Sequence, residues 1–380
     1  MGVYEKLDVK TMINAVGNGT AAGGSIMRPE VFAAMEDASR SFVRLPELLQ
    51  KAGRRVAELA GVEAAYITAG AAAGVTVAVA ACMTGKDDAK VNQLPNTEGM
   101  KDEVIIQVMQ RNYYELMIRL AGARIVEVGL ANRTYPWHIE SAINERTAAI
   151  VHFVAYSPPQ DLPVENVIEI AHKHRVPVIV DAAAEFPPFS NLRRYADMGA
   201  DLTIFSGGKG LRGPQSSGLI LGREDLIEAC AMHSSPNHGV GRPPKVGKEE
   251  VIGLVTALEL FASEEFSQAE LNSYEERTAY IVEALSHTPG IVAYRETAPP
   301  SSFSELSGAA PEGVPLAHVE WEEAIIPKSK EEVRQELAEG SPGIMAAFSP
   351  KGISLAPHTM QPGEERIVAE RVAQLLSTQE

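Results

Sequence analysis

A single lysine stands among glycines in the stretch Phe205-Ser206-Gly207-Gly208-Lys209-Gly210-Leu211-Arg212-Gly213-Pro214-Gln215-Ser216-Ser217-Gly218. A β-type run, residues 201–205, comes directly before it, so we expect the amine of Lys209 at a strand end with little side-chain bulk around it. A buried lysine loses its proton readily, and the uncharged amine forms Schiff bases with carbonyl compounds. The same residues also fit a glycine-rich hairpin with an exposed lysine, and this stretch alone does not choose between the two interpretations.

Composition narrows the class of protein. The 380 residues are 45% hydrophobic, as in soluble globular proteins, and 34 basic against 50 acidic residues give a net charge of −16. With no basic run, this balance predicts no nucleic-acid partner. Cys82 and Cys230 are too far apart in sequence to indicate a disulfide framework or a metal site. The N-terminus lacks the apolar segment of a signal peptide, and no apolar run is long enough to span a membrane, so we expect no membrane association and a cytoplasmic location.

Apolar strand-like segments alternate with helical spacing through the first two thirds of the chain. The run Val176–Val180 is apolar throughout and ends at Asp181. Strands that are apolar on both faces and alternate with helices predict a mostly parallel sheet covered on both sides. Sites in such sheets lie at the carboxyl ends of the strands. We therefore expect Asp181 and Lys209 at the same edge of one sheet.

A third strand end carries a turn of small residues. The strand around 65–67 continues through Thr68, Ala69, Gly70, Ala71 and Ala72 into a helix. Small residues leave the amide groups of a helix N-terminus uncovered, and these amides together with the helix dipole favour a phosphate. Close packing of a helix on a sheet would also account for them. Residues 17–25 fit a dinucleotide-binding loop poorly, because the third glycine is one position late.

The last third of the chain predicts a smaller domain. A helix from 249 to 261, extending toward 285, is followed by strand-like and helical segments of mixed order. We therefore divide the chain into residues 1–250, an N-terminal segment with a large domain, and residues 251–380, a small α+β domain.

Three features expected at one sheet edge match the needs of pyridoxal 5'-phosphate. This cofactor requires a cradle for its phosphate, an anionic partner for its ring nitrogen and a lysine for its aldehyde. Asp181 would keep the ring nitrogen protonated, and Ala183 is small enough to lie under the ring. Ser206 would add a hydroxyl to the phosphate site, and Lys209 would bind the aldehyde.

Several segments resemble the fold-type I pyridoxal-phosphate family that includes bacterial selenocysteine synthase: 132–134, 178–181, 205–209 and 213–215. Others, 13–17, 180–188 and 241–249, are closer to its short branch, the D-glucosaminate-6-phosphate ammonia-lyase-like proteins. The resemblance implies an α/β fold like that of aspartate aminotransferase and a homodimer or larger homo-oligomer with sites at subunit interfaces. It also implies Lys209 as the Schiff-base lysine, Asp181 at the ring nitrogen, and residues 68–72 with Ser206 at the phosphate.

The departures from selenocysteine synthase concern the substrate. The tRNA-binding domain of that enzyme is not expected here, and Gly24 replaces one of its active-site arginines. Arg111, Arg242 and Lys245 keep basic positions of the family and are candidates for binding a substrate carboxylate or distal phosphate. Surface ion pairing explains each of them equally well. A ring-stacking group is expected near the helix after Met109, with Tyr113 one candidate among its neighbours.

We therefore expect a pyridoxal-phosphate-dependent lyase. Its substrate would be a small, anionic 2-amino-3-hydroxy acid such as D-glucosaminate 6-phosphate, converted to a 2-oxo acid and ammonia, with Lys209 as the base at Cα. An amino-acid racemase or epimerase begins with the same deprotonation and stays open as an alternative. A selenium transferase-like protein or a non-catalytic binding protein is the alternative from a different class.

Overall fold

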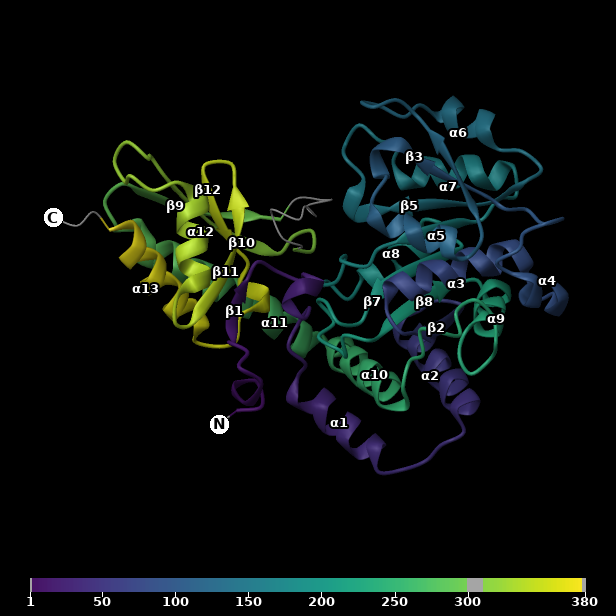
Figure 1. Ribbon diagram of the computed structural model, residues 1–380, viewed down its shortest axis with the longest axis horizontal. Coiled ribbons are helices and arrows are strands. Elements are labelled where there is room, and N and C mark those ends of the chain that lie inside the picture. Colours follow the sequence, from purple (N-terminus) through teal and green to yellow (C-terminus); the bar gives the residue numbers. More distant parts are fainter. Residues whose placement is uncertain (1, 299–309, 378–380) are drawn as a thin grey trace. The chain divides into compact units, whose positions relative to one another are not determined.

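The computed structural model describes residues 2–298 and 310–377, and the chain divides into two compact units. The larger unit, Ile26–Ser263, contains a seven-stranded sheet in the order β2-β8-β7-β6-β5-β3-β4 (Figure 1). Its strands are β2 (Ala64–Thr68), β3 (Glu103–Gln107), β4 (Arg124–Val128), β5 (Thr147–Phe153), β6 (Val178–Asp181), β7 (Leu202–Ser206) and β8 (Gly218–Gly222).

The sheet is parallel from β4 to β7, and β8 runs antiparallel to both of its neighbours, β7 and β2. Every residue of β5 and β6 is buried, as expected for strands covered on both faces. The carboxyl ends of β2, β3, β5, β6 and β7 therefore lie at one edge, where β8 begins. The mostly parallel α/β sheet predicted from the sequence is confirmed.

Ten helices of this unit surround the sheet or connect its strands. Helix α3 is buried along most of its length, since it packs on the sheet and against α5 and α9. A Cβ at Gly74 would lie 3.0 Å from Ile204 Cγ2, so a small residue is needed where α3 meets β7. The helices are α1 (Pro29–Ser39), α2 (Leu45–Ala60), α3 (Ala71–Thr84), α4 (Asp88–Gln93), α5 (Leu116–Leu120), α6 (Pro136–Ala142), α7 (Val164–Lys173), α8 (Asn191–Asp197), α9 (Glu224–His233) and α10 (Lys248–Ala262).

The smaller unit comprises Met1–Ser25 and Glu264–Glu380 and has its own apolar core. Its five-stranded sheet has the order β1-β11-β12-β10-β9; α11 and α12 pack against the sheet, and α13 packs against these two helices. The elements are β1 (Met12–Ala15), α11 (Glu264–Ser286), β9 (Ile291–Thr297), β10 (Pro315–Trp321), α12 (Lys330–Glu339), β11 (Gly343–Ser349), β12 (Gly352–Leu355) and α13 (Glu364–Leu376).

These units differ from the division expected at residue 250. Strand β1 pairs in parallel with β11, Met12 opposite Gly343, so the N-terminal segment belongs to the C-terminal unit. The single helix expected from 249 toward 285 is two helices, because α10 ends at Ala262 and α11 begins at Glu264. Within the described residues, no helix is long and apolar enough to cross a membrane.

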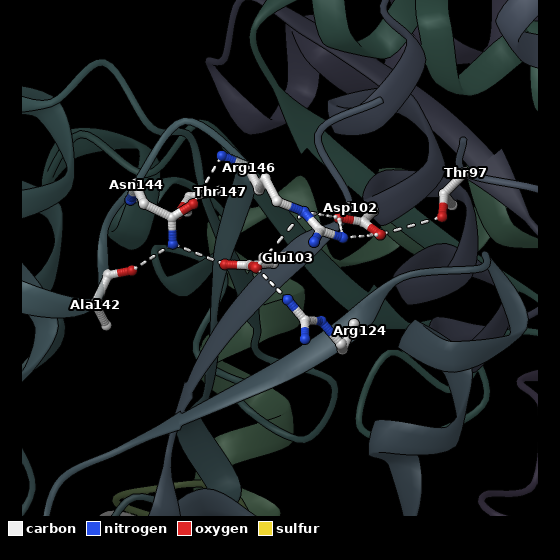
Figure 2. A network of polar contacts seen from close by, with 8 residues as sticks. All are labelled: Thr97, Asp102, Glu103, Arg124, Ala142, Asn144, Arg146 and Thr147. Carbon is white, nitrogen blue, oxygen red and sulfur yellow. Dashed lines mark hydrogen bonds and ion pairs between the residues drawn. The ribbon is translucent and has the colours of Figure 1, made fainter. Parts of the chain in front are cut away.

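A polar network holds the opposite, amino-terminal end of the strands (Figure 2). Arg146 donates to both carboxylate oxygens of Asp102, at 2.7 and 2.8 Å. Glu103 pairs with Arg124 and accepts a 2.8 Å hydrogen bond from Asn144. Both carboxylates are buried, and a buried charge needs such partners. This network ties together β3, β4 and β5 at the edge away from Asp181 and Lys209.

Candidate active site

Asp181 and Lys209 lie on neighbouring strand ends. β6 ends at Asp181, which is paired in register with Ile204 of β7, and Lys209 follows β7 by three residues. A Cβ at Gly210 would stand 1.8 Å from the carbonyl oxygen of Phe186, so only glycine allows this approach. The turn that carries the lysine is thereby packed directly against the segment that follows Asp181.

The turn around Lys209 is closed by backbone hydrogen bonds. Gly207 donates to Ser217 O and Gly213 to Gly207 O, both at 2.9 Å. The strands that it joins, β7 and β8, are antiparallel neighbours. The glycine-rich stretch is therefore a hairpin, but its lysine is partly buried rather than exposed.

Burial and mutual attraction act in opposite directions on the two charged groups. Burial lowers the pKa of Lys209, and the nearby carboxylates of Asp181 and Glu185 partly counter this. Burial raises the pKa of Asp181, which Lys209 and a 3.0 Å hydrogen bond from the backbone N–H of Ala183 partly counter. The site thus combines an amine that gives up its proton more easily than usual with a buried carboxyl suited to a cationic ring nitrogen.

The N-terminus of α3 forms an open cradle beside this pair. Gly70 has a φ of +129°, and no heavy atom lies within 4 Å of the position a Cβ would take there. No side chain caps the helix, and the first amides of a helix have no intrahelical partner. The donor set and the free space at Gly70 suit an anion.

The predicted phosphate residues meet around the first residue of β8. Gly218 is the register partner of both Thr68 and Ser206. A Cβ at Gly218 would lie 2.5 Å from the carbonyl carbon of Gly70, so this glycine permits the cradle to close on β8. Thr68 Oγ1 donates to Gly70 O at 2.9 Å, which fixes the turn. Ala69, Ala71, Ala72 and Ala183 are partly exposed at the same edge. Carboxylate, amine and cradle thus match the three requirements of pyridoxal phosphate.

The basic candidates for substrate binding, Arg111, Arg242 and Lys245, differ in their ion pairing and exposure. Arg111 forms ion pairs with Glu115 and Glu127, which raise its pKa. Lys245 is exposed and Arg242 partly exposed on a loop. A small cavity of about 10 Å³ is lined by Thr68 and Ala73 together with Gly241 and Pro244 of that loop, which places the loop beside the cradle. Tyr113, the ring-stacking candidate, is 85% exposed in this chain.

Sequence reasoning missed three buried polar residues at this edge. The carboxylate of Glu185 lies near enough to Lys209 to counter part of the lowering that burial causes in the pKa of Lys209. Gln107 pairs through its side-chain amide with the backbone N–H and C=O of Leu162, at 2.8 and 3.0 Å. Gln110 accepts a 2.9 Å hydrogen bond from Phe153 N, and Phe153 is the register partner of Asp181. The glutamine partners lie 43 to 55 residues away, so no local pattern reveals them.

Comparison with known proteins decides the family. The profile of SelA, described as L-seryl-tRNA selenium transferase, matches residues 20–275. The chain belongs to this family. Among individual relatives, the D-glucosaminate-6-phosphate ammonia lyase of Salmonella typhimurium (strain 14028s / SGSC 2262) is 37% identical over 297 residues, which is 77% of each chain. The 5'-C-glycyluridine monooxygenase-decarboxylase of a Streptomyces species is 38% identical over 298 residues, 76% of this chain and 72% of that protein.

Solved structures agree with this placement. A structure of D-glucosaminate-6-phosphate ammonia-lyase superimposes with a TM-score of 0.84 over 99% of both chains at 33% identity. Aspartate aminotransferase of Thermus thermophilus, at 18% identity, has a TM-score of 0.54 over 98% of this chain and 94% of its own, and shares the fold. These findings confirm the resemblance, the fold-type I class and the expectation of an enzyme of the ammonia-lyase kind.

Proposed function

We propose that this member of the SelA family is a pyridoxal-phosphate-dependent lyase. It would release ammonia from a small, anionic 2-amino-3-hydroxy acid, with D-glucosaminate 6-phosphate as the first candidate. The observation that carries the proposal is the juxtaposition of Lys209, Asp181 and the open N-terminus of α3 at one sheet edge. The relatives named as ammonia lyases, 37% and 33% identical, support the reaction type.

The cofactor would supply an aldehyde that binds the substrate amino group and a ring that withdraws electrons from Cα. Asp181 would hold the ring nitrogen in its protonated form. The amides of Ala71 and Ala72, with the hydroxyl of Ser206, would hold the phosphate, and Thr68 would fix the turn through its hydrogen bond to Gly70 O.

Lys209 would move the proton at the substrate Cα. Its lowered pKa leaves more of the amine uncharged at neutral pH, which is the form that acts as a base. The 3-hydroxyl would then leave as water, and addition of one water at C2 would give a 2-oxo acid and ammonia. Arg242 and Lys245, on the loop whose Gly241 and Pro244 share a small cavity with Thr68 and Ala73, are the candidates for the substrate carboxylate or a distal phosphate. The pairing of Arg111 with Glu115 and Glu127 makes it the weaker candidate for this role.

A second candidate function rests on the Streptomyces relative, which at 38% identity is named a monooxygenase-decarboxylase. An enzyme of that kind would consume oxygen and release carbon dioxide. The same Lys209 and Asp181 would serve it, because fold and cofactor residues do not fix the reaction type.

The proposal is tested by incubating the purified protein and pyridoxal phosphate with D-glucosaminate 6-phosphate, the unphosphorylated sugar acid and other 2-amino-3-hydroxy acids. Ammonia and 2-oxo acid should appear in equal amounts without oxygen uptake, and Lys209→Ala should abolish both. Oxygen uptake with carbon dioxide release would favour the second candidate. Deuterium entering Cα without ammonia would favour a racemase.

A further inference from the structure

A buried carboxyl group without a partner lies in the loop between β5 and α7. Asp161 is 6% exposed, and no donor lies at normal hydrogen-bond distance and angle from either of its carboxylate oxygens. The hydroxyl of Thr134, a residue that is 4% exposed, also lacks a partner. Thr134 comes from a different loop, and its backbone N–H reaches Gln160 O at 3.4 Å, next to Asp161. Two buried oxygen groups thus meet between two loops, and neither has a hydrogen bond of normal geometry.

The neighbouring side chains do not neutralise this carboxyl group. Gln110 is fully buried, and its amide nitrogen lies 3.2 Å from His152 Nδ1 and 3.1 Å from Ser157 Oγ. The amide of Gln110 carries no charge, whichever of these groups its two hydrogens reach. Burial lowers the pKa of His152 to about 4, which keeps its ring uncharged at neutral pH.

The charge of Asp161 is therefore uncompensated within the described residues. Burial raises its pKa to about 6, and only polar contacts with the uncharged side chains of Gln110, Thr134 and Ser157 lower it; none of these supplies a counter-charge. At pH 8 the carboxyl is still ionised. A buried carboxylate without a counter-charge is costly, and a bound cation removes that cost.

We propose that Asp161, Thr134 and Ser157 form a binding site for one alkali cation, potassium or sodium. The donors are a carboxylate and two hydroxyl oxygens, which are hard ligands. One carboxylate balances a single positive charge, whereas calcium sites usually combine several carboxylates. No group of three or more histidine, cysteine or acidic side chains suited to a metal ion occurs among residues 2–298 and 310–377. The bound cation would join the loop after β4 to the loop after β5. Gln110 binds the start of that second loop at Phe153, and Gln107 binds its end at Leu162.

Thermal unfolding at pH 8 tests the site directly. The full-length protein is compared in potassium, sodium and tetramethylammonium chloride at equal ionic strength. One alkali ion should raise the midpoint by about 2–4 °C in a saturable way. Asp161→Asn should abolish this shift, because the neutral amide has no charge to balance. Asp197→Asn, which changes an exposed aspartate paired with Arg193 on α8, should retain it.

Thallium(I), a heavy substitute for potassium, provides a second measurement that needs no variant. Wild-type crystals soaked in thallium(I) acetate should show an anomalous peak between Asp161 and Thr134. Equal midpoints in all three salts, an ion-specific shift that survives Asp161→Asn, or no anomalous peak at this position would overturn the proposal. Stabilisation that appears only on lowering the pH through about 6, equally in every salt, would show a protonated carboxyl instead and also overturn it.

Discussion

At the scale of single residues, the site depends on shifted ionisation. Lys209 and Asp181 are opposite in charge. Burial lowers the pKa of Lys209 and raises the pKa of Asp181, so it favours the neutral form of each group. Opposing shifts of this kind are typical of functional sites, where burial and a specific charged partner act together. In the proposed enzyme, the cationic ring nitrogen would give Asp181 the counter-charge that keeps it ionised.

Asp181→Asn tests this pairing. The variant should still bind pyridoxal phosphate but should lose roughly 10²-fold or more in kcat, since a neutral amide does not hold the ring nitrogen protonated. Steady-state kinetics and the absorbance spectrum measure the two effects. Asp102→Asn is a matched control, because Asp102 is also buried but lies in the network at the other end of the strands. An Asp181→Asn enzyme with wild-type kcat would contradict the assigned role.

His152 predicts an acid-dependent loss of stability. Its pKa is about 4 in the folded chain against 6.5 when exposed, so between these values the unfolded chain binds a proton that the folded chain does not. The contribution of His152 to stability should therefore fall as the pH falls from 6.5 toward 4, by about 2 kcal/mol between pH 7 and pH 5, and Asp161, whose pKa is raised to about 6, acts in the opposite direction over the same range. His152→Gln should remove this contribution, as measured by urea unfolding at the two pH values. Equal pH dependence of variant and wild type would show that His152 is not buried as described.

At the scale of elements, the cradle depends on how closely α3 approaches β8. The turn at Gly70 and Ala71 comes so near to Gly218 that a Cβ there would lie 2.5 and 2.8 Å from their backbone atoms. The sequence predicted the turn and its helix, because small residues follow an apolar strand. It did not predict that Gly218 starts an antiparallel strand between Thr68 and Ser206, since that pairing is set by long-range contacts.

Gly218→Ala should push the cradle away from β8. Inserting a methyl group into such a contact costs about 1–3 kcal/mol of stability. Affinity for pyridoxal phosphate should fall by about tenfold or more. A loss of about 1.4 kcal/mol of binding free energy is enough to reduce the affinity tenfold. Absorbance titration with the cofactor measures the affinity, and unfolding of the cofactor-free protein measures the stability. Unchanged affinity would mean that the turn at 68–72 does not hold the phosphate.

At the scale of the whole molecule, the proposed cofactor residues all belong to the unit Ile26–Ser263. The sequence predicted the parallel sheet and the position of Asp181 and Lys209 at one of its edges, since both follow from apolar runs and the residues that end them. The membership of the N-terminal segment could not be predicted, because β1 pairs with β11 more than 300 residues later. The roles of Gln107 and Gln110 could not be predicted either, because their hydrogen-bond partners are also distant in sequence. The homo-oligomer implied by the resemblance stays a prediction.

The covalent bond between Lys209 and pyridoxal phosphate is the central claim, and one measurement tests it most directly. The purified protein is reconstituted with the cofactor, its absorbance is recorded before and after borohydride, and the reduced protein is digested and mapped by mass spectrometry. The wild type should show a visible band that borohydride removes, with the cofactor attached to the peptide that contains Lys209, and Lys209→Ala should show neither. No band in the reconstituted wild type, or a label on a different lysine, would contradict the account.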